Sequence, residues 1–251
     1  MTPSISVAVI AAALLFAAVH LFVGRLRRLD GLPRSRWLSL SGGAAVSYIF
    51  LHLLPELTAH QRTIDAVAAG PPAVPQAVYL VALVGLTTFY GLERHARFSA
   101  RTSGPDQEGG HLPPGLFWVH ALSFAAYNLL VGYLLVHRER PGPTELLLYA
   151  VAMALHFMAN DHGLRQHYRE RYDRIARWLF AGAVVGGCAL GFAVELPAAA
   201  IALLFAFLAG GVLLNVLKEE LPEERESAFL PFLAGVAGYG LLMQAARVSG
   251  A

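Results

Sequence analysis

The sequence predicts an all-α, polytopic membrane protein with eight transmembrane helices. The first observation is composition: 56% of the 251 residues are hydrophobic, only 14% are charged, and the mean hydropathy is +0.53. Soluble chains carry about 25% charged residues, so a soluble domain of this size would lack the charge to cover its surface. The second observation is a series of long apolar stretches, and the third is the placement of arginines between them.

Each predicted span is an apolar stretch of about 20 residues, the length needed to cross the hydrocarbon core. Basic residues follow the first stretch instead of preceding it, which favours a span over a signal peptide. The longest polar stretch, residues 93–114, contains SGPDQEGG and predicts a flexible cytoplasmic loop. The approximate spans are 4–24, 37–56, 75–92, 115–137, 144–166, 175–195, 197–217 and 228–247.

Basic residues alternate from loop to loop. The loops after the first, third, fifth and seventh spans hold 15 of the 19 Lys and Arg residues, and the other side holds 4. Because positive loops stay in the cytoplasm, this pattern predicts a protein of the inner (plasma) membrane with both termini outside the cytoplasm. The net charge of +2 argues against nucleic acid as a partner, and membrane lipid is the expected surrounding.

Two segments of the chain look alike. Residues 42–56 end in HLLPE and residues 209–223 end in EELPE, and the alignment of LPE with LPE places Gly43 on Gly210, 167 residues apart. The segments lie five spans apart, so they cross the membrane in opposite directions, as the inverted repeats of secondary transporters do. We therefore expect one domain, 1–251, in a 3+2+3 arrangement, with repeats at about 4–95 and 175–247 flanking the two middle spans at 115–166.

This 3+2+3 layout resembles the ZIP (Zrt/Irt-like) family of divalent metal transporters. The resemblance rests on eight spans, both termini outside, the HLLPE that closes the second span, and the glycine-bearing seventh span that ends in LPE. It implies transport of a divalent metal ion, with Zn²⁺ as the expected substrate and Fe²⁺ or Mn²⁺ as alternatives. A homodimer is left open.

Polar side chains within the fourth and fifth spans are the candidate metal ligands. Ionisable groups at membrane depth are costly, so they are functional candidates. Helical spacing places His120 and Tyr127 on one face of the fourth span. Counted from the outer ends, His120 lies level with Asp161 and Tyr127 lies near the level of His156, so the two helices are expected to meet there. The complete candidate set is Asn128, His156, Asn160, Asp161, His120 and Tyr127, whose nitrogen and oxygen atoms suit Zn²⁺, Fe²⁺ or Mn²⁺.

The family resemblance also shows where this chain departs from the pattern. In the fourth span Tyr127 takes the place of the first histidine, Asn128 matches the asparagine, and Val131 replaces an acid. In the fifth span His156 matches the first histidine and Phe157 replaces an acid. Because two carboxylates are missing, the resemblance implies a single, weak metal site.

Ionisable residues near the ends of spans are candidates for the approach and exit of the ion. Structural alternatives remain open for the central residues: a core histidine, amides that bond between helices, or pairing of Asp161 with Arg165 four residues on. His20, in the first span, is interpreted as a polar residue at a helix end. The approach and exit candidates are His52, Glu56, His162, His167, Glu219 and Glu220.

Sequence motifs of common enzyme classes are absent. The sequence has no His-Glu-x-x-His, no Gly-x-Ser-x-Gly and no P-loop, so we expect that the protein is not an enzyme. The main alternative is a membrane sensor or interaction protein that uses a ZIP-like scaffold without transporting. Transport requires a polar cavity between the second, fourth, fifth and seventh spans, whereas a scaffold protein would fill this centre with apolar side chains.

Overall fold

A computed structural model describes residues 3–24, 34–67, 75–102, 114–138, 142–217 and 228–249. Nearly all of these residues are helical, and they include no strand. The elements are α1 (Pro3–Phe22), α2 (Arg34–Tyr48), the π-helical segment η2 (Ile49–Leu53), α3 (Leu54–Val67), α4 (Ala77–Thr102), α5 (Pro114–Val136), α6 (Pro143–Arg171), the π-helical segment η3 (Tyr172–Ala176), α7 (Arg177–Ala193), α8 (Ala198–Asn215) and α9 (Phe229–Ser249).

The chain is a multi-pass membrane protein. Five helical segments within the described residues are long and apolar enough to cross a bilayer, and parts of α4 and α9 form shorter apolar helices. Large apolar side chains cover the outside of the bundle; Leu83, Leu230 and Leu241 are 55%, 75% and 70% exposed. Such a surface is unfavourable in water and fits contact with lipid.

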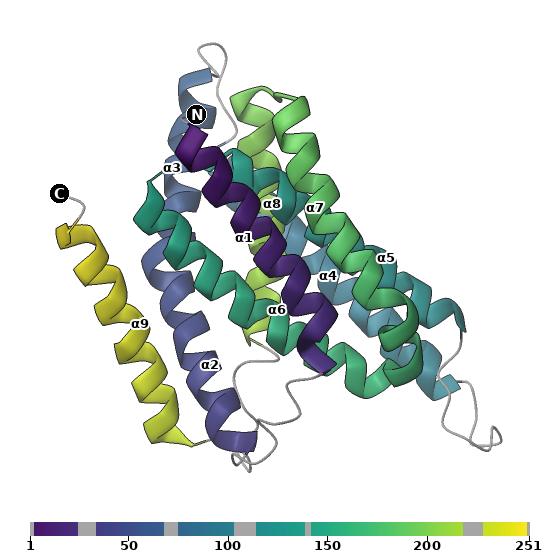
Figure 1. Cartoon of the computed structure of the whole chain (residues 1–251). Coiled ribbons are helices and arrows are strands. Elements are labelled where there is room, and N and C mark those ends of the chain that lie inside the picture. The colour runs from purple at the N-terminus through teal and green to yellow at the C-terminus, as the bar shows by residue number, and fades with distance from the viewer. Residues whose placement is uncertain are drawn as a thin grey trace.

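Successive helices run in alternating directions. The elements α2, η2 and α3 make up one pass, and α6 turns back into α7 through η3 (Figure 1). Helix α1 begins and α9 ends at the same end of the bundle (Figure 1). We refer to this end as the terminal end and to the other as the opposite end.

The second pass is longer than the sequence predicts. Pro55 was expected to close it, but the helix continues to Val67. Proline lacks an N–H and crowds the carbonyl group four residues earlier; the π-helical segment Ile49–Leu53 lies directly before it and widens the helix there. Helix α4 likewise extends to Thr102, into the predicted loop 93–114, whose residues 103–113 lie outside the described part.

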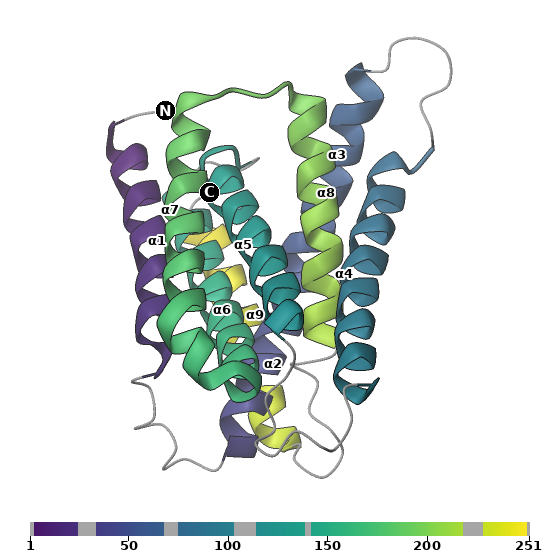
Figure 2. The same cartoon turned by 90° about the vertical axis from the view of Figure 1, so that its right-hand side faces the viewer.

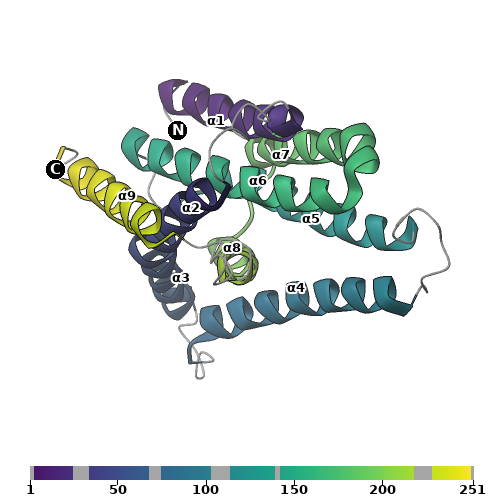
Figure 3. The ribbon, with the colours of Figure 1, turned by 90° about the horizontal axis from the view of Figure 1, so that it is seen from below.

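The helices form two groups (Figure 3). In the first, α5 packs extensively on α7, and α1 packs on α6 and α7. In the second, α2 packs on α9, while α3 and α4 pack on α8. Contacts between the groups are fewer and involve mainly α2 with α6, α4 with α5, and α5 with α8.

Two helix pairs of the second group meet at glycines in the same way. A Cβ atom on Gly43 of α2 would lie 2.1 Å from the carbonyl oxygen of Phe232 in α9, and one on Gly210 of α8 would lie 1.9 Å from that of Ala82 in α4. The partner helices contribute glycines in return, because a Cβ on Gly235 would meet a carbonyl of α2 and one on Gly85 a carbonyl of α8, each at 2.1 Å. Helices α2 and α8 run in opposite directions (Figure 2).

Helix α6 is the most polar of the helices that cross the bundle. It is not among the candidate spans selected by length and hydropathy, and it contacts α1, α2 and α9. His156, Asn160 and Asp161 in its middle are at least 92% buried. Protein surrounds this stretch on several sides, so polar side chains there can find hydrogen-bond partners that lipid would not supply.

Candidate functional site: a buried polar cluster below a cleft

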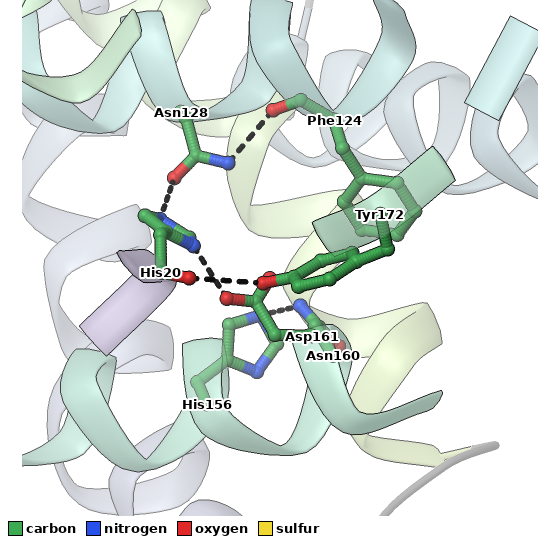
Figure 4. A network of polar contacts seen from close by, with 7 residues as sticks. All are labelled: His20, Phe124, Asn128, His156, Asn160, Asp161 and Tyr172. Atoms are coloured by element: carbon green, nitrogen blue, oxygen red, sulfur yellow. Dashed lines mark hydrogen bonds and ion pairs between the residues drawn. The ribbon is translucent and has the colours of Figure 1, made fainter. Parts of the chain in front are cut away.

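The centre of the first helix group holds a buried polar cluster (Figure 4). His20 of α1 lies between Asp161 of α6 and Asn128 of α5. Its Nδ1 is 2.7 Å from Asp161 Oδ2, and its Nε2 is 2.8 Å from Asn128 Oδ1. All three residues are at least 98% buried, so three helices are joined through one imidazole ring.

The geometry determines how many protons this cluster holds. Asn128 Nδ2 donates to the carbonyl oxygen of Phe124 at 2.8 Å, which turns Oδ1 toward His20. Because an amide oxygen only accepts, His20 Nε2 carries a hydrogen. A second proton must lie between Nδ1 and the Asp161 carboxyl group, since two lone pairs would repel at 2.7 Å. The His20–Asp161 pair therefore has no net charge, whichever partner holds that proton.

Aromatic residues enclose the pair. Tyr172 in η3 is fully buried and its hydroxyl donates to the backbone carbonyl of His20 at 3.2 Å. The His20 ring lies 4.7 Å from the Phe157 ring and 5.6 Å from the Phe180 ring, centroid to centroid. These contacts fix the ring plane and exclude water from it.

A second set of bonds surrounds His156. Its Nε2 is 3.0 Å from Asn160 Nδ2 and 3.2 Å from the hydroxyl of Tyr127. An amide nitrogen donates, so Nε2 is an acceptor and the imidazole is neutral. The structure thus brings Tyr127 of α5 to His156 of α6, the two residues placed near the same depth by the sequence.

The cluster supplies imidazole nitrogen, amide oxygen and one carboxylate. Within the described part of the chain, no three His, Cys, Asp or Glu side chains lie close enough to hold one metal ion. The nitrogen of His156 and the oxygen of Asp161 that a cation would seek are both engaged by neighbouring side chains. A metal ion must therefore break internal hydrogen bonds to bind, which makes binding weak.

A cleft opens above the cluster, toward the terminal end; we call it the terminal cleft. It is narrow: the gaps between its lining atoms, together with open space at its mouth, add up to about 450 Å³. Met153 at its floor is three residues, or about 4.5 Å along the helix axis, from His156. Its lining comes from the second, fourth, fifth and seventh passes: Tyr48, Leu53, Glu56, His60, Leu134, His137, Arg138, Tyr149, Met153, Phe205, Leu208, Ala209 and Val212.

Opposite charges lie in the terminal cleft. Glu56 is 3.3 Å from His52 Nε2, one turn deeper, and the His52 ring stacks on Tyr48 at 5.3 Å. Arg138, just after the end of α5, donates from Nε to the carbonyl of Leu135 at 3.2 Å. Burial lowers the pKa of Arg138, while Tyr149 and Glu56 act in the opposite direction. The positive charge of Arg138 offsets the negative charge of Glu56, so the cleft lacks a strong negative field.

Several predicted site residues lie elsewhere. His120 is half-buried, and its Nδ1 meets the Tyr168 hydroxyl at 3.2 Å, so it does not join Asp161. His162 is exposed on α6. The side chain of His167 and residues Glu219 and Glu220 lie outside the described residues.

The pairing of Asp161 with Arg165, kept open from the sequence, does not occur. Asp161 faces His20, and Arg165 instead holds Asp173 through two hydrogen bonds of 2.7 and 2.8 Å. Four-residue spacing allowed the pairing, but the two side chains point to different neighbours: Asp161 to α1 and Arg165 to η3.

The sequence reasoning missed His20 and Tyr172. His20 is an ionisable residue in the last turn of α1, at nearly the same depth from the inner end as Asp161, so the rule applied to the middle spans would have selected it. Tyr172 fell in a predicted loop and carried no comparable signal. The role of Tyr172 follows only from the packing of η3 against α1, where its hydroxyl meets the carbonyl group of His20.

Comparison with known proteins identifies no relative of the chain. It matches no family model, no curated protein and no solved structure.

Proposed function

We propose that this protein carries a divalent metal ion, zinc-like in its ligand preference, across the membrane. The observation that supports this most is the terminal cleft, which is lined by the second, fourth, fifth and seventh passes and ends one helical turn from His156. These are the four spans between which transport requires a cavity; Glu56, His60, His137 and Arg138 supply its ionisable side chains, and the rest of the lining is mainly apolar. In this proposal Glu56 and His52 receive the ion, and His156, Asn160, Asn128 and Asp161 coordinate it in turn.

The paired helix contacts support an inverted repeat. The spacing of 167 residues that relates Gly43 to Gly210 also relates their neighbours Leu40 and Phe207, whose carbonyl groups face Gly235 and Gly85. Equivalent contacts in oppositely directed helices are what two inverted copies of one unit would produce. Transporters with inverted repeats alternate access by moving one helix group against the other, and the sparse contacts between the two groups here are compatible with such movement.

Charge limits how the ion is held. A divalent cation away from water needs negative charge nearby, and the cluster has one carboxylate, already neutralised with His20. The proposed site therefore binds weakly and releases readily, which suits a carrier and not a storage site. Binding at Asp161 requires His20 to give up that oxygen.

A second function is favoured by the closed centre. Tyr127, Phe157 and Val131 are at least 98% buried between the cleft and the rest of the cluster. A membrane protein that senses or binds a partner without transporting could keep its centre filled by such side chains. This second candidate predicts no uptake by the native chain.

Uptake into proteoliposomes tests the proposal. Purified protein is reconstituted, and Zn²⁺ entering the vesicles is followed with a trapped fluorescent indicator. The proposal predicts uptake above empty vesicles, loss of most of it in His156→Ala, and no change in His95→Ala, an exposed histidine near the end of α4. Native uptake equal to that of empty vesicles would favour the non-transporting alternative, and equal uptake by the two variants would remove His156 as a ligand.

A further inference from the structure

A second cleft lies at the opposite end of the bundle, away from the polar cluster. It encloses about 800 Å³ of empty space, part of it open. Leu21, Phe22 and Gly24, at the end of α1, form one wall of this cleft. The start of α7 forms the other wall. We call this the arginine cleft; its remaining lining residues are Arg165, Asp173, Arg177 and Trp178.

One of its two arginines is fully paired. Arg165 holds Asp173 with both Nε and Nη2, at 2.7 and 2.8 Å. Gly24 lies directly against this guanidinium group, because a Cβ there would be 3.3 Å from Arg165 Cζ. The Arg165–Asp173 pair therefore forms a neutral wall of the cleft.

The other arginine has an unused donor. Arg177 Nε is buried and has no hydrogen-bond partner, and among the described residues no carboxylate lies within ion-pair distance of Arg177. Its guanidinium carbon is 5.5 Å from the centre of the Trp178 ring. A buried N–H without an acceptor is costly, and the cleft carries one net positive charge, so its complement is an anion with hydrogen-bond acceptors.

The rim of the cleft is apolar. Phe22 is 47% and Trp178 is 58% exposed. Both are at helix ends, where the last turn of α1 meets the first turn of α7, and tryptophan is typical of the membrane–water interface. A free inorganic anion would gain nothing from this rim, whereas a molecule with acyl chains would cover it.

We propose that the arginine cleft binds the headgroup phosphate of an anionic phospholipid. The phosphate oxygens accept from Arg177, and the acyl chains descend along Phe22 and Trp178. Basic pockets between membrane helices bind anionic headgroups in this manner. This proposal rests on residues outside the polar cluster and does not depend on whether the protein transports a metal.

Thermal unfolding of the full-length chain in detergent micelles tests it. Dioleoylphosphatidylglycerol is titrated in, with dioleoylphosphatidylcholine and inorganic phosphate as parallel arms. Saturable stabilisation by phosphatidylglycerol alone is expected. In Arg177→Gln the apparent Kd should rise about ten- to hundredfold, the loss expected for one charge-assisted hydrogen bond.

Arg174→Gln is the matched control, because Arg174 is exposed in η3 and does not line the cleft; its affinity should equal that of the native chain. Arg177→Lys keeps the charge and should retain part of the affinity, which provides a measurement even if Arg177→Gln does not fold. Equal phosphatidylglycerol affinity in the native chain, Arg177→Gln and Arg177→Lys would overturn the proposal. Stabilisation by inorganic phosphate as strong as that by the lipid would also overturn it, in favour of a free-anion site.

Discussion

The two helix groups share glycine contacts but differ in a buried polar contact. In the first group α5 meets α7 at Gly132 and Gly187, where an added Cβ would lie 2.1 and 2.0 Å from a carbonyl oxygen of the other helix. In the second group, α2 meets α9 and α4 meets α8 through glycines that bring one backbone onto another. In the first group, α1 is joined to α5 and α6 through His20 and its two buried partners. Close packing of small residues is sufficient to associate membrane helices, and the second group shows that this chain uses it.

The difference indicates that the His20 contact serves more than packing. A buried ion pair contributes little net stability, and replacing it with apolar side chains is often neutral or favourable, whereas removing one partner is costly. The glycine contacts have no such asymmetry, because they contain no charge. We therefore expect that replacing both members of the His20–Asp161 pair lowers stability less than replacing one, whereas replacing more of the glycines lowers stability further.

The largest effect is expected from Asp161→Ala. It leaves His20 buried without its carboxylate, which should lower the free energy of unfolding by about 3–5 kcal/mol. His20→Leu combined with Asp161→Leu should recover most of this loss, because no unpaired ionisable group remains and only the amide oxygen of Asn128 loses its donor. Reversible unfolding in mixed micelles measures both. A double variant as unstable as Asp161→Ala would mean that the pair is needed for packing.

Gly210→Ala is expected to come next. Its Cβ would lie 1.9 Å from the carbonyl oxygen of Ala82, a backbone atom that cannot rotate away, and such overpacking costs about 3 kcal/mol. Gly182→Ala is the control, because an added Cβ there meets no atom within 4 Å. The same unfolding assay should show no loss for Gly182→Ala. Similar losses in both would show that the close approach at Gly210 does not determine the result.

Tyr127→His tests whether an ion reaches His156 in the polar cluster. The Tyr127 hydroxyl is 3.2 Å from His156 Nε2, so histidine at this position offers a second imidazole to the same ion. Zn²⁺ affinity measured by calorimetry should rise about tenfold, or about 1.4 kcal/mol. Tyr127→Phe, which adds no ligand, should not raise it. Unchanged affinity in Tyr127→His would argue that no ion reaches His156.

The smallest effect is expected from Asp173→Asn. Its carboxylate pairs with Arg165 but its side chain is 37% exposed, and partly exposed ion pairs contribute at most about 1 kcal/mol. In micelles without anionic lipid, the unfolding free energy should fall by no more than this. A loss as large as that of Asp161→Ala would place the Arg165–Asp173 pair in a far less hydrated environment than its exposure indicates.

Part of the candidate site followed from the sequence. Helical periodicity and depth brought Tyr127 to His156, because both residues lie on regular helices whose rise per residue is constant. The same rules selected Asp161 but not its partner, since depth says how far along a helix a residue lies and not which neighbouring helix it faces. Pro55 was misjudged as a helix end because the π-helical segment before it relieves the clash that proline creates.

The sequence by itself determined the class of protein: with few charges and many long apolar stretches, the chain can bury its surface only in lipid. Only the tertiary structure decided that α6 lies against α1, and hence that the Asp161 carboxylate faces an imidazole and is already neutralised. Hydropathy is a property of each segment alone, whereas the partner of a buried charge depends on how helices distant in the sequence pack. The availability of that carboxylate to a cation is for this reason a property of the fold.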